Sequence, residues 1–162
     1  MPGEIIFDNE SNLTSGARGE PGQRLFYVII EQGDRWARIW LEKGELVGLG
    51  QAVAQSLAAR SSAVEEQHIA HSDPPGTPIY EFQASQIGLG ADDNRDMLIL
   101  MFRGEHLDNY IEIQAWASKP MMHALSARID EVAAAGRPTC PLCGLAVDPA
   151  GHFCVRTNGR MH

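Results

Sequence analysis

The feature that most constrains the fold is a pattern of two strands and a helix that occurs twice along the chain. In its first occurrence, RLFYVIIEQGDRWARIWLEK at residues 24–43 predicts two strands joined by a tight turn at residues 32–34. We expect the apolar strand positions to be Phe26, Val28 and Ile30 on the first strand and Trp36, Ile39 and Leu41 on the second. A hairpin of this kind exposes one apolar face, which requires a covering layer.

A helix is predicted to follow this hairpin. Its apolar residues recur at steps of three and four, at Leu46, Leu49, Val53 and Leu57. Gly48 and Gly50 interrupt the pattern, and each lowers helix stability by up to about 1 kcal/mol relative to alanine. We therefore expect packing against the rest of the protein, rather than helix propensity, to hold this segment.

The second occurrence begins with a strand near Tyr80 and continues with the apparent hairpin DMLILMFRGE and NYIEIQAWAS. Ser118 is placed to cap a helix that begins with Lys119-Pro120, where proline is tolerated. The predicted apolar stripe of this helix is Met122, Leu125, Ile129 and Val132. Gly136 and Pro138 are expected to end it.

This order predicts an α+β fold, in which two hairpin-plus-helix halves form an antiparallel sheet with both helices on one face. The body of the protein is expected to span residues 1–136, and the polar residues 61–78 are expected to be a mobile linker between the halves. Residues 137–162 then form a separate small tail.

All three cysteines lie in this tail, in a pattern that predicts a zinc knuckle. Cys140 and Cys143 are separated by two residues, and Gly144 permits a turn whose N–H groups face the sulfur atoms. His152 and Cys154 are two residues apart, so an extended segment places them on one side. The resulting C-x2-C-x8-H-x-C spacing supplies three cysteines and one histidine, the ligand set of a closed, structural, tetrahedral Zn²⁺ site.

Other interpretations of the tail are open from sequence alone. His162 competes with His152 as the fourth ligand. A dithiol redox centre also uses C-x-x-C, but such a motif normally begins a helix after a strand. The remaining alternatives are a catalytic zinc site with one open coordination position, a nucleophilic cysteine paired with His152, and three inert thiols. The zinc interpretation is preferred because four candidate ligands, three cysteines and one histidine, lie within fifteen residues.

Charge separates the tail from the body. The net charge is −8. The tail has three arginines and one acid, a net +2, which leaves −10 for residues 1–136. The acidic total argues against a protein that coats nucleic acid through its overall charge.

The N-terminus shows no basic region followed by an apolar run, so a cytoplasmic location is expected. In that compartment clustered thiols favour metal binding over disulfides.

The stretches GRPTCPLCGLAVDPAGHFCVRTNG, GEPGQRLFYV and WLEKGELVGLGQAVAQSL together give the chain a family resemblance. The chain resembles a bacterial family known as domain of unknown function 3090, found mainly in actinobacteria and Chloroflexi. The resemblance covers nearly the full chain and implies a cytoplasmic protein with no established activity. Cys140, Cys143, His152 and Cys154 fall on the tail pattern of that family.

Two main functions follow as hypotheses. The first is a non-enzymatic adaptor that presents the knuckle to a macromolecular partner, with Arg137, Arg156 and Arg160 as contact residues; Arg24, at a turn beside the first hairpin, is a further anion- or partner-binding candidate. We expect that partner to be another protein. RNA binding through the knuckle is a minority hypothesis, and no membrane partner is expected.

The alternative is an enzyme for a phosphorylated or nucleotide-like ligand, bound between the halves by Arg24, Lys43 and Arg103.

Overall fold

The structure, a computed structural model, describes residues 3–7, 11–20, 23–60 and 73–135. The first half of this body contains β1 (Gly3–Phe7), β2 (Asn12–Arg18), β3 (Leu25–Gln32), β4 (Arg35–Leu41) and α1 (Lys43–Ala59). The second contains β5 (Tyr80–Gln83), β6 (Gln86–Asp92), β7 (Met97–His106), β8 (Asn109–Ser118) and α2 (Lys119–Ala134). Each half is thus a short strand, three longer strands and a helix, and the α+β class is confirmed.

The two halves exchange their first strands. Three consecutive strands of each half form an antiparallel meander, β2-β3-β4 in the first and β6-β7-β8 in the second. The short strand β1 pairs in parallel with β8, and β5 pairs in parallel with β4. The result is two mixed four-stranded sheets, β1-β8-β7-β6 (sheet A) and β2-β3-β4-β5 (sheet B), instead of the single antiparallel sheet that we predicted.

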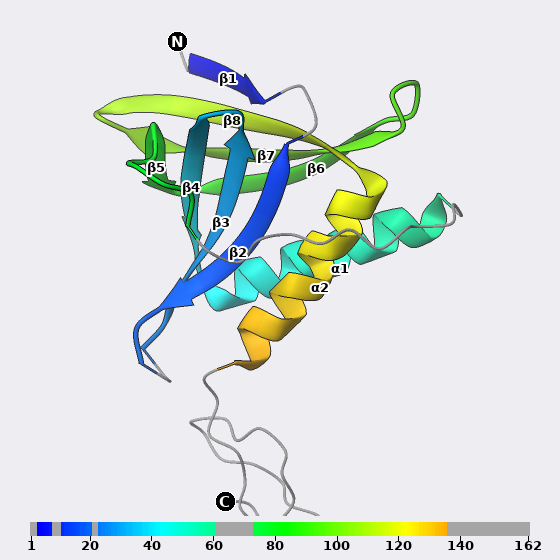
Figure 1. Cartoon of the computed structure of the whole chain (residues 1–162), viewed down its shortest axis with the longest axis horizontal. Coiled ribbons are helices and arrows are strands. Elements are labelled where there is room, and N and C mark those ends of the chain that lie inside the picture. The colour runs from blue at the N-terminus through cyan, green and yellow to red at the C-terminus, as the bar shows by residue number, and fades with distance from the viewer. Residues whose placement is uncertain (1–2, 8–10, 21–22, 61–72, 136–162) are drawn as a thin grey trace, which may run out of the picture.

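Both sheets and both helices share one hydrophobic core. In Figure 1 the strands of sheet A run across the view, those of sheet B descend from them, and the two helices cross beside sheet B. The exchanged strands contribute Phe7 and Phe82 to this core, and each stands opposite a residue of the other half, Phe7 opposite Ala115 and Phe82 opposite Ile39. Apolar burial therefore ties the halves together rather than closing each one separately.

The helices form where the sequence predicts them. Leu46, Leu49, Val53 and Leu57 of α1 are buried, as is the stripe Met122, Leu125, Ile129 and Val132 of α2. The Ser118 hydroxyl accepts a hydrogen bond from the Met121 backbone N–H at 3.3 Å, so the predicted helix cap is confirmed.

Helix α2 covers the open edge of β2. The guanidinium Nε of Arg128 donates to the Ser15 carbonyl at 3.0 Å, and the Leu13 N–H points to the Met121 sulfur at 3.4 Å. These contacts occupy backbone groups that an exposed edge strand would present to another chain.

The second strand of the first hairpin corrects one expectation. Ala37, Ile39 and Leu41 face the shared core, whereas Trp36 belongs to a separate small cluster with Tyr27 and Ile29. Side chains alternate along a strand with a period of two, so Trp36 and Ile39 cannot face the same side of β4. Trp36 instead lies on the outer face of sheet B, where it is still buried.

Candidate functional site

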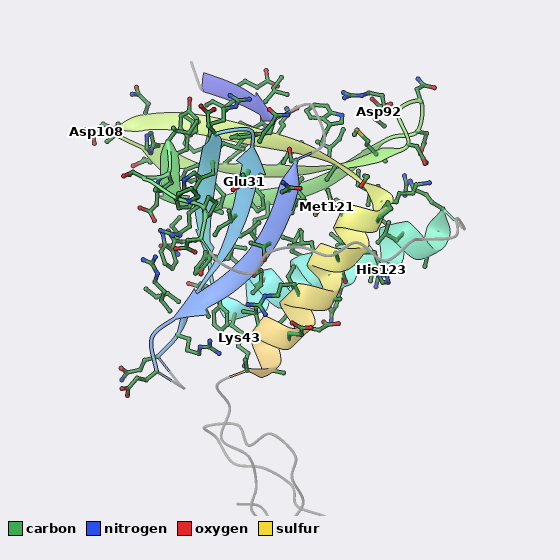
Figure 2. The ribbon with its side chains drawn as sticks, in the orientation of Figure 1. Glu31, Lys43, Asp92, Asp108, Met121 and His123 are labelled. Atoms are coloured by element: carbon green, nitrogen blue, oxygen red, sulfur yellow. The ribbon has the colours of Figure 1, made fainter. Side chains whose placement is uncertain are left out.

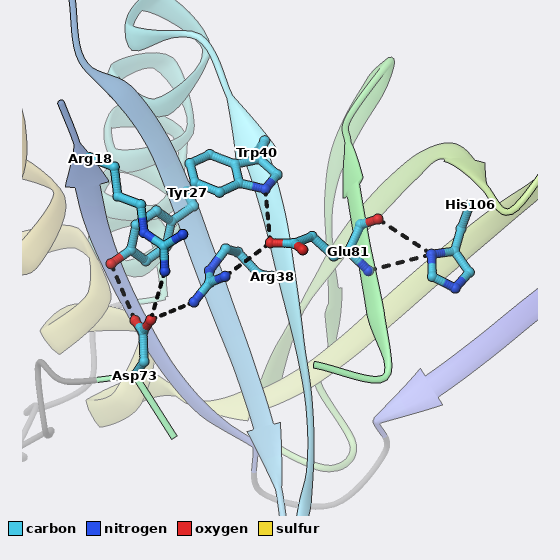
Figure 3. A network of polar contacts seen from close by, with 7 residues as sticks. All are labelled: Arg18, Tyr27, Arg38, Trp40, Asp73, Glu81 and His106. Atoms are coloured by element: carbon cyan, nitrogen blue, oxygen red, sulfur yellow. Dashed lines mark hydrogen bonds and ion pairs between the residues drawn. The ribbon is translucent and has the colours of Figure 1, made fainter. Parts of the chain in front are cut away.

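The outer face of sheet B holds an arginine that is almost completely buried. Arg38 lies in the middle of β4 between Trp36 and Trp40, and only 5% of its surface is exposed. An arginine in this position needs ion pairs and hydrogen bonds to offset the loss of its hydration. Figure 3 shows the polar network around it. We call the following residues the Arg38 cluster: Arg18, Tyr27, Arg38, Trp40, Asp73 and Glu81, together with Trp36, whose ring lies beside the Arg38 guanidinium.

Two carboxylates bind the two ends of the Arg38 guanidinium. Its Nη1 donates to Glu81 Oε2 at 2.9 Å, and its Nη2 donates to Asp73 Oδ2 at 2.5 Å. Glu81 stands directly opposite Arg38 in the parallel pairing of β4 and β5. Trp40 Nε1 donates to the same Glu81 oxygen at 3.1 Å. The exchanged strand β5 therefore supplies one of the two counter-ions.

The Asp73 carboxylate accepts hydrogen bonds from residues of three neighbouring strands. Besides Arg38 of β4, it accepts from Arg18 Nη2 of β2 at 3.1 Å and from the Tyr27 hydroxyl of β3 at 3.3 Å. Asp73 itself belongs to no strand; it lies in the connection between the two halves. Sheet B thus provides an arrangement of donors that converges on one carboxylate.

Aromatic rings surround the charged groups. The Arg38 Cζ atom lies 5.1 Å from the ring centroids of Tyr27 and Trp36 and 5.7 Å from that of Trp40. Arg18 lies 5.7 Å from the Trp40 ring, and Tyr27 and Trp40 meet edge to face at 5.2 Å. Such rings attract a guanidinium electrostatically and restrict its rotation.

The environment favours the protonated form of Tyr27. Burial, and then the negative charge and hydrogen bond of Asp73, raise the pKa of the Tyr27 hydroxyl above its ordinary value. The opposing influence of Arg38 and Arg18 is smaller. Tyr27 consequently acts as a hydrogen-bond donor to Asp73 at neutral pH.

Two buried donors of the cluster have no acceptor in the described part of the chain. They are Arg38 Nε and the indole Nε1 of Trp36. The cluster therefore has more N–H and O–H donors than its two carboxylates satisfy.

The network extends to His106, the last residue of β7. The His106 ring lies 5.3 Å from the Tyr80 ring, and His106 Nδ1 lies 3.3 Å from the backbone carbonyl oxygen of Glu81. This contact joins the end of β7, in sheet A, to β5, in sheet B.

Of the residues that the sequence singled out, Arg24 is engaged within the body. Its guanidinium donates to the backbone carbonyl of Ala135, at the end of α2, and lies 5.9 Å from the Phe26 ring. The predicted ligands Cys140, Cys143, His152, His162 and Cys154 and the predicted contact residues Arg137, Arg156 and Arg160 lie outside the described residues.

The other predicted ligand contacts are on different elements. Lys43 begins α1 (Figure 2), whereas Arg103 lies on the outer face of sheet A. Arg103 Nε pairs with Glu112 at 3.3 Å, and its Nη1 donates to Gln86 at 3.2 Å. Arg103, Glu112 and Gln86 line an open groove of about 380 Å³ beside Gly88 and Met101.

The Arg38 cluster was not among the sites predicted from the sequence. One pattern could have indicated it: Trp36, Arg38 and Trp40 alternate, which places an arginine between two tryptophans on one strand face. No comparable pattern marks Asp73 or Glu81, because each is brought to Arg38 by pairing between distant segments.

Within residues 3–7, 11–20, 23–60 and 73–135 there is no group of three histidine, cysteine, aspartate or glutamate side chains that could hold a metal ion. Nor do the helices of these segments include one that is long and apolar enough to cross a bilayer.

Comparison with known proteins gives one match. The model of a family described as "Protein of unknown function (DUF3090)" matches residues 5–154. Neither a search of curated proteins nor a search of solved structures finds a match to the chain.

Proposed function

We propose that this chain, which belongs to the DUF3090 family of proteins of unknown function, is a zinc-binding adaptor whose C-terminal tail contacts another protein. The observation that carries the proposal is the C-x2-C-x8-H-x-C spacing of Cys140, Cys143, His152 and Cys154. Four such ligands close the coordination shell of Zn²⁺ and leave no position for substrate, which is typical of a structural site.

A contact within the body holds the residue that follows α2, close to where the tail begins in the sequence. The Arg24 guanidinium donates to the Ala135 carbonyl, immediately after α2 and just before the tail begins. In this proposal the contact between Arg24 and Ala135 orients the start of the tail, and Arg24 also remains a candidate for binding a partner or an anion. Arg137, Arg156 and Arg160 supply the positive charge of the tail, opposite in sign to the body.

Metal content tests the first part of the proposal. The purified full chain is expected to hold one zinc ion, measured by elemental analysis after extensive dialysis. Cys140→Ser should lose the metal, while His123→Ala, which removes an exposed histidine of α2, should retain it. His152→Ala and His162→Ala distinguish the two candidate ligands. A wild-type protein purified without zinc, and unable to take it up, contradicts the proposal.

Partner capture tests the second part. We expect a protein partner that co-purifies with the wild-type chain to be lost in Cys140→Ser and in the triple replacement of Arg137, Arg156 and Arg160 by alanine. The same variants report on the minority hypothesis, because salt-sensitive RNA binding that depends on these arginines would identify a nucleic acid instead. Capture that is unchanged in both variants contradicts a role for the tail.

A second candidate function is an enzyme for a phosphorylated ligand with zinc only structural. It is favoured by one observation: Arg103 lines the groove beside β6, where Glu112 and Gln86 already orient its guanidinium. Thermal stabilisation by members of a phosphometabolite panel, lost in Arg103→Met, is the expected result. A panel without stabilising ligands argues against this candidate.

A further inference from the structure

We infer that the outer face of sheet B is an oxyanion-binding site in which the Asp73 carboxylate occupies the place of an external ligand. The site is separate from the zinc tail, and the inference does not depend on the proposed function. It rests on the three donors that meet at Asp73, on the burial of Arg38 and on the origin of Asp73 outside the sheet.

The sheet holds the backbones of the three donor residues independently of Asp73. Arg18, Tyr27 and Arg38 lie on β2, β3 and β4, which are paired over their whole lengths. The Nη1 end of Arg38 is fixed by Glu81, and the adjacent rings restrict its plane. The Nη2 group therefore keeps its direction when Asp73 leaves, so the donor arrangement is preorganised for another acceptor.

The electrostatic balance selects an anion. With Asp73 in place, two arginines face two carboxylates; without it, one positive charge has no counter-ion in the cluster. Burial of Arg38 strengthens the attraction for a replacement anion, because the surroundings screen charge less than water does. Arginine pairs favour planar or tetrahedral oxyanions, namely carboxylates and phosphates.

Solvent can reach the position of Asp73. The Asp73 side chain is 35% exposed and that of Arg18 is 54% exposed, in contrast to 6% for Arg38. A ligand therefore contacts Arg18 first and completes its bonds with Tyr27 and Arg38 as Asp73 withdraws. Because Asp73 is part of the same chain, it competes at high effective concentration and keeps the wild-type affinity low.

Removing the competitor tests the inference. Inorganic phosphate and, separately, acetate are titrated into wild-type protein and Asp73→Ala at constant ionic strength, and binding is followed by the Nε1–H resonance of Trp40. In Asp73→Ala we expect saturable binding at least about tenfold tighter than in the wild type, since a charged competitor is lost. Adding Arg18→Ala to Asp73→Ala should weaken that binding by about tenfold. The Trp116 resonance, from sheet A, should not move.

Asp93→Ala is the matched control, because it removes the carboxylate of an exposed ion pair with Arg60. It should leave phosphate binding unchanged. A response to phosphate alone assigns the site to phosphates, and a response to both anions assigns it to oxyanions generally. Equal binding by the wild type, Asp73→Ala and Asp93→Ala overturns the inference.

Anion rescue keeps the test decisive if Asp73→Ala folds poorly. Phosphate or acetate should then raise the melting temperature of Asp73→Ala, and of the milder Asp73→Asn, more than that of Asp93→Ala. No selective rise in either variant, compared with sodium chloride of equal ionic strength, overturns the inference as well.

Discussion

Gly50 of α1 lies directly against Ile129 of α2: a Cβ atom at position 50 would fall 2.9 Å from Ile129 Cγ2. The Ser126 hydroxyl on α2 donates to the Gly50 carbonyl at 3.1 Å, so backbone and side chain meet at the same point. Ile129 is 1% exposed and β-branched, and it has no room to turn away. The glycine that weakens α1 as an isolated helix is thus the residue that lets the two helices touch.

Replacing the two glycines of α1 should have opposite effects. Gly50→Ala should destabilise the protein by about 1–2 kcal/mol, because overpacking at Ile129 exceeds the gain in helix propensity. Gly48→Ala, where nothing lies within 4 Å of the added Cβ, should instead stabilise it by about 0.5–1 kcal/mol. Urea unfolding curves measure both, and two changes of equal sign would contradict the close contact.

Arg38→Met should destabilise the protein by about 2 kcal/mol. Loss of one partner of a buried ion pair costs roughly 3–5 kcal/mol, but solvent reaches Asp73 and Glu81 and reduces the penalty. Arg60→Met is the control, since Asp93 is 81% exposed and the loss should stay below about 1 kcal/mol. Chemical denaturation measures the free energy of unfolding of both variants. Similar losses would contradict a larger contribution from the buried ion pairs of Arg38 than from the exposed pair of Arg60.

The raised pKa of Tyr27 predicts a loss of stability in alkali. Above about pH 10 an unfolded tyrosine releases its proton while folded Tyr27 retains its own, so the native state binds more protons and stability falls as pH rises. The contribution is fully present below that pH. Tyr27→Phe should therefore show a shallower decline between pH 9 and 11 than the wild type. Tyr110→Phe removes an exposed hydroxyl of β8 and should decline as the wild type does.

Removal of zinc should leave the body folded. The shared core of sheets A and B and both helices lies within residues 3–135, so a chelator is expected to change the tail while the unfolding transition of the body persists. Proteolysis after chelation, followed by mass spectrometry, should first cleave within residues 137–162. Loss of the cooperative transition on chelation would mean that the metal is required for the body itself.

The local parts of this fold could be predicted from the residues. The alternation of Phe26, Val28 and Ile30 and the spacing of Leu46, Leu49 and Val53 place each residue on the correct face. Ser118 marks the start of α2 because its hydroxyl satisfies a backbone N–H three residues away. These features depend on neighbours within one turn or one hairpin, so a short stretch of sequence contains their causes.

What only the tertiary structure decided is the exchange of β1 and β5 and the site that it creates. Phe7 packs beside β8, about a hundred residues later in the chain, and Glu81 reaches Arg38 through the pairing of β4 with β5. No local pattern distinguishes these pairings from a strand that stays with its own half. Burial in a shared core stabilises the exchanged arrangement, and that free energy depends on all the packed elements together. Arg38, a charged residue between two tryptophans on one strand face, becomes a buried ion-pair centre only through two distant carboxylates. Asp73 comes from the connection between the halves, and Glu81 comes from the second half.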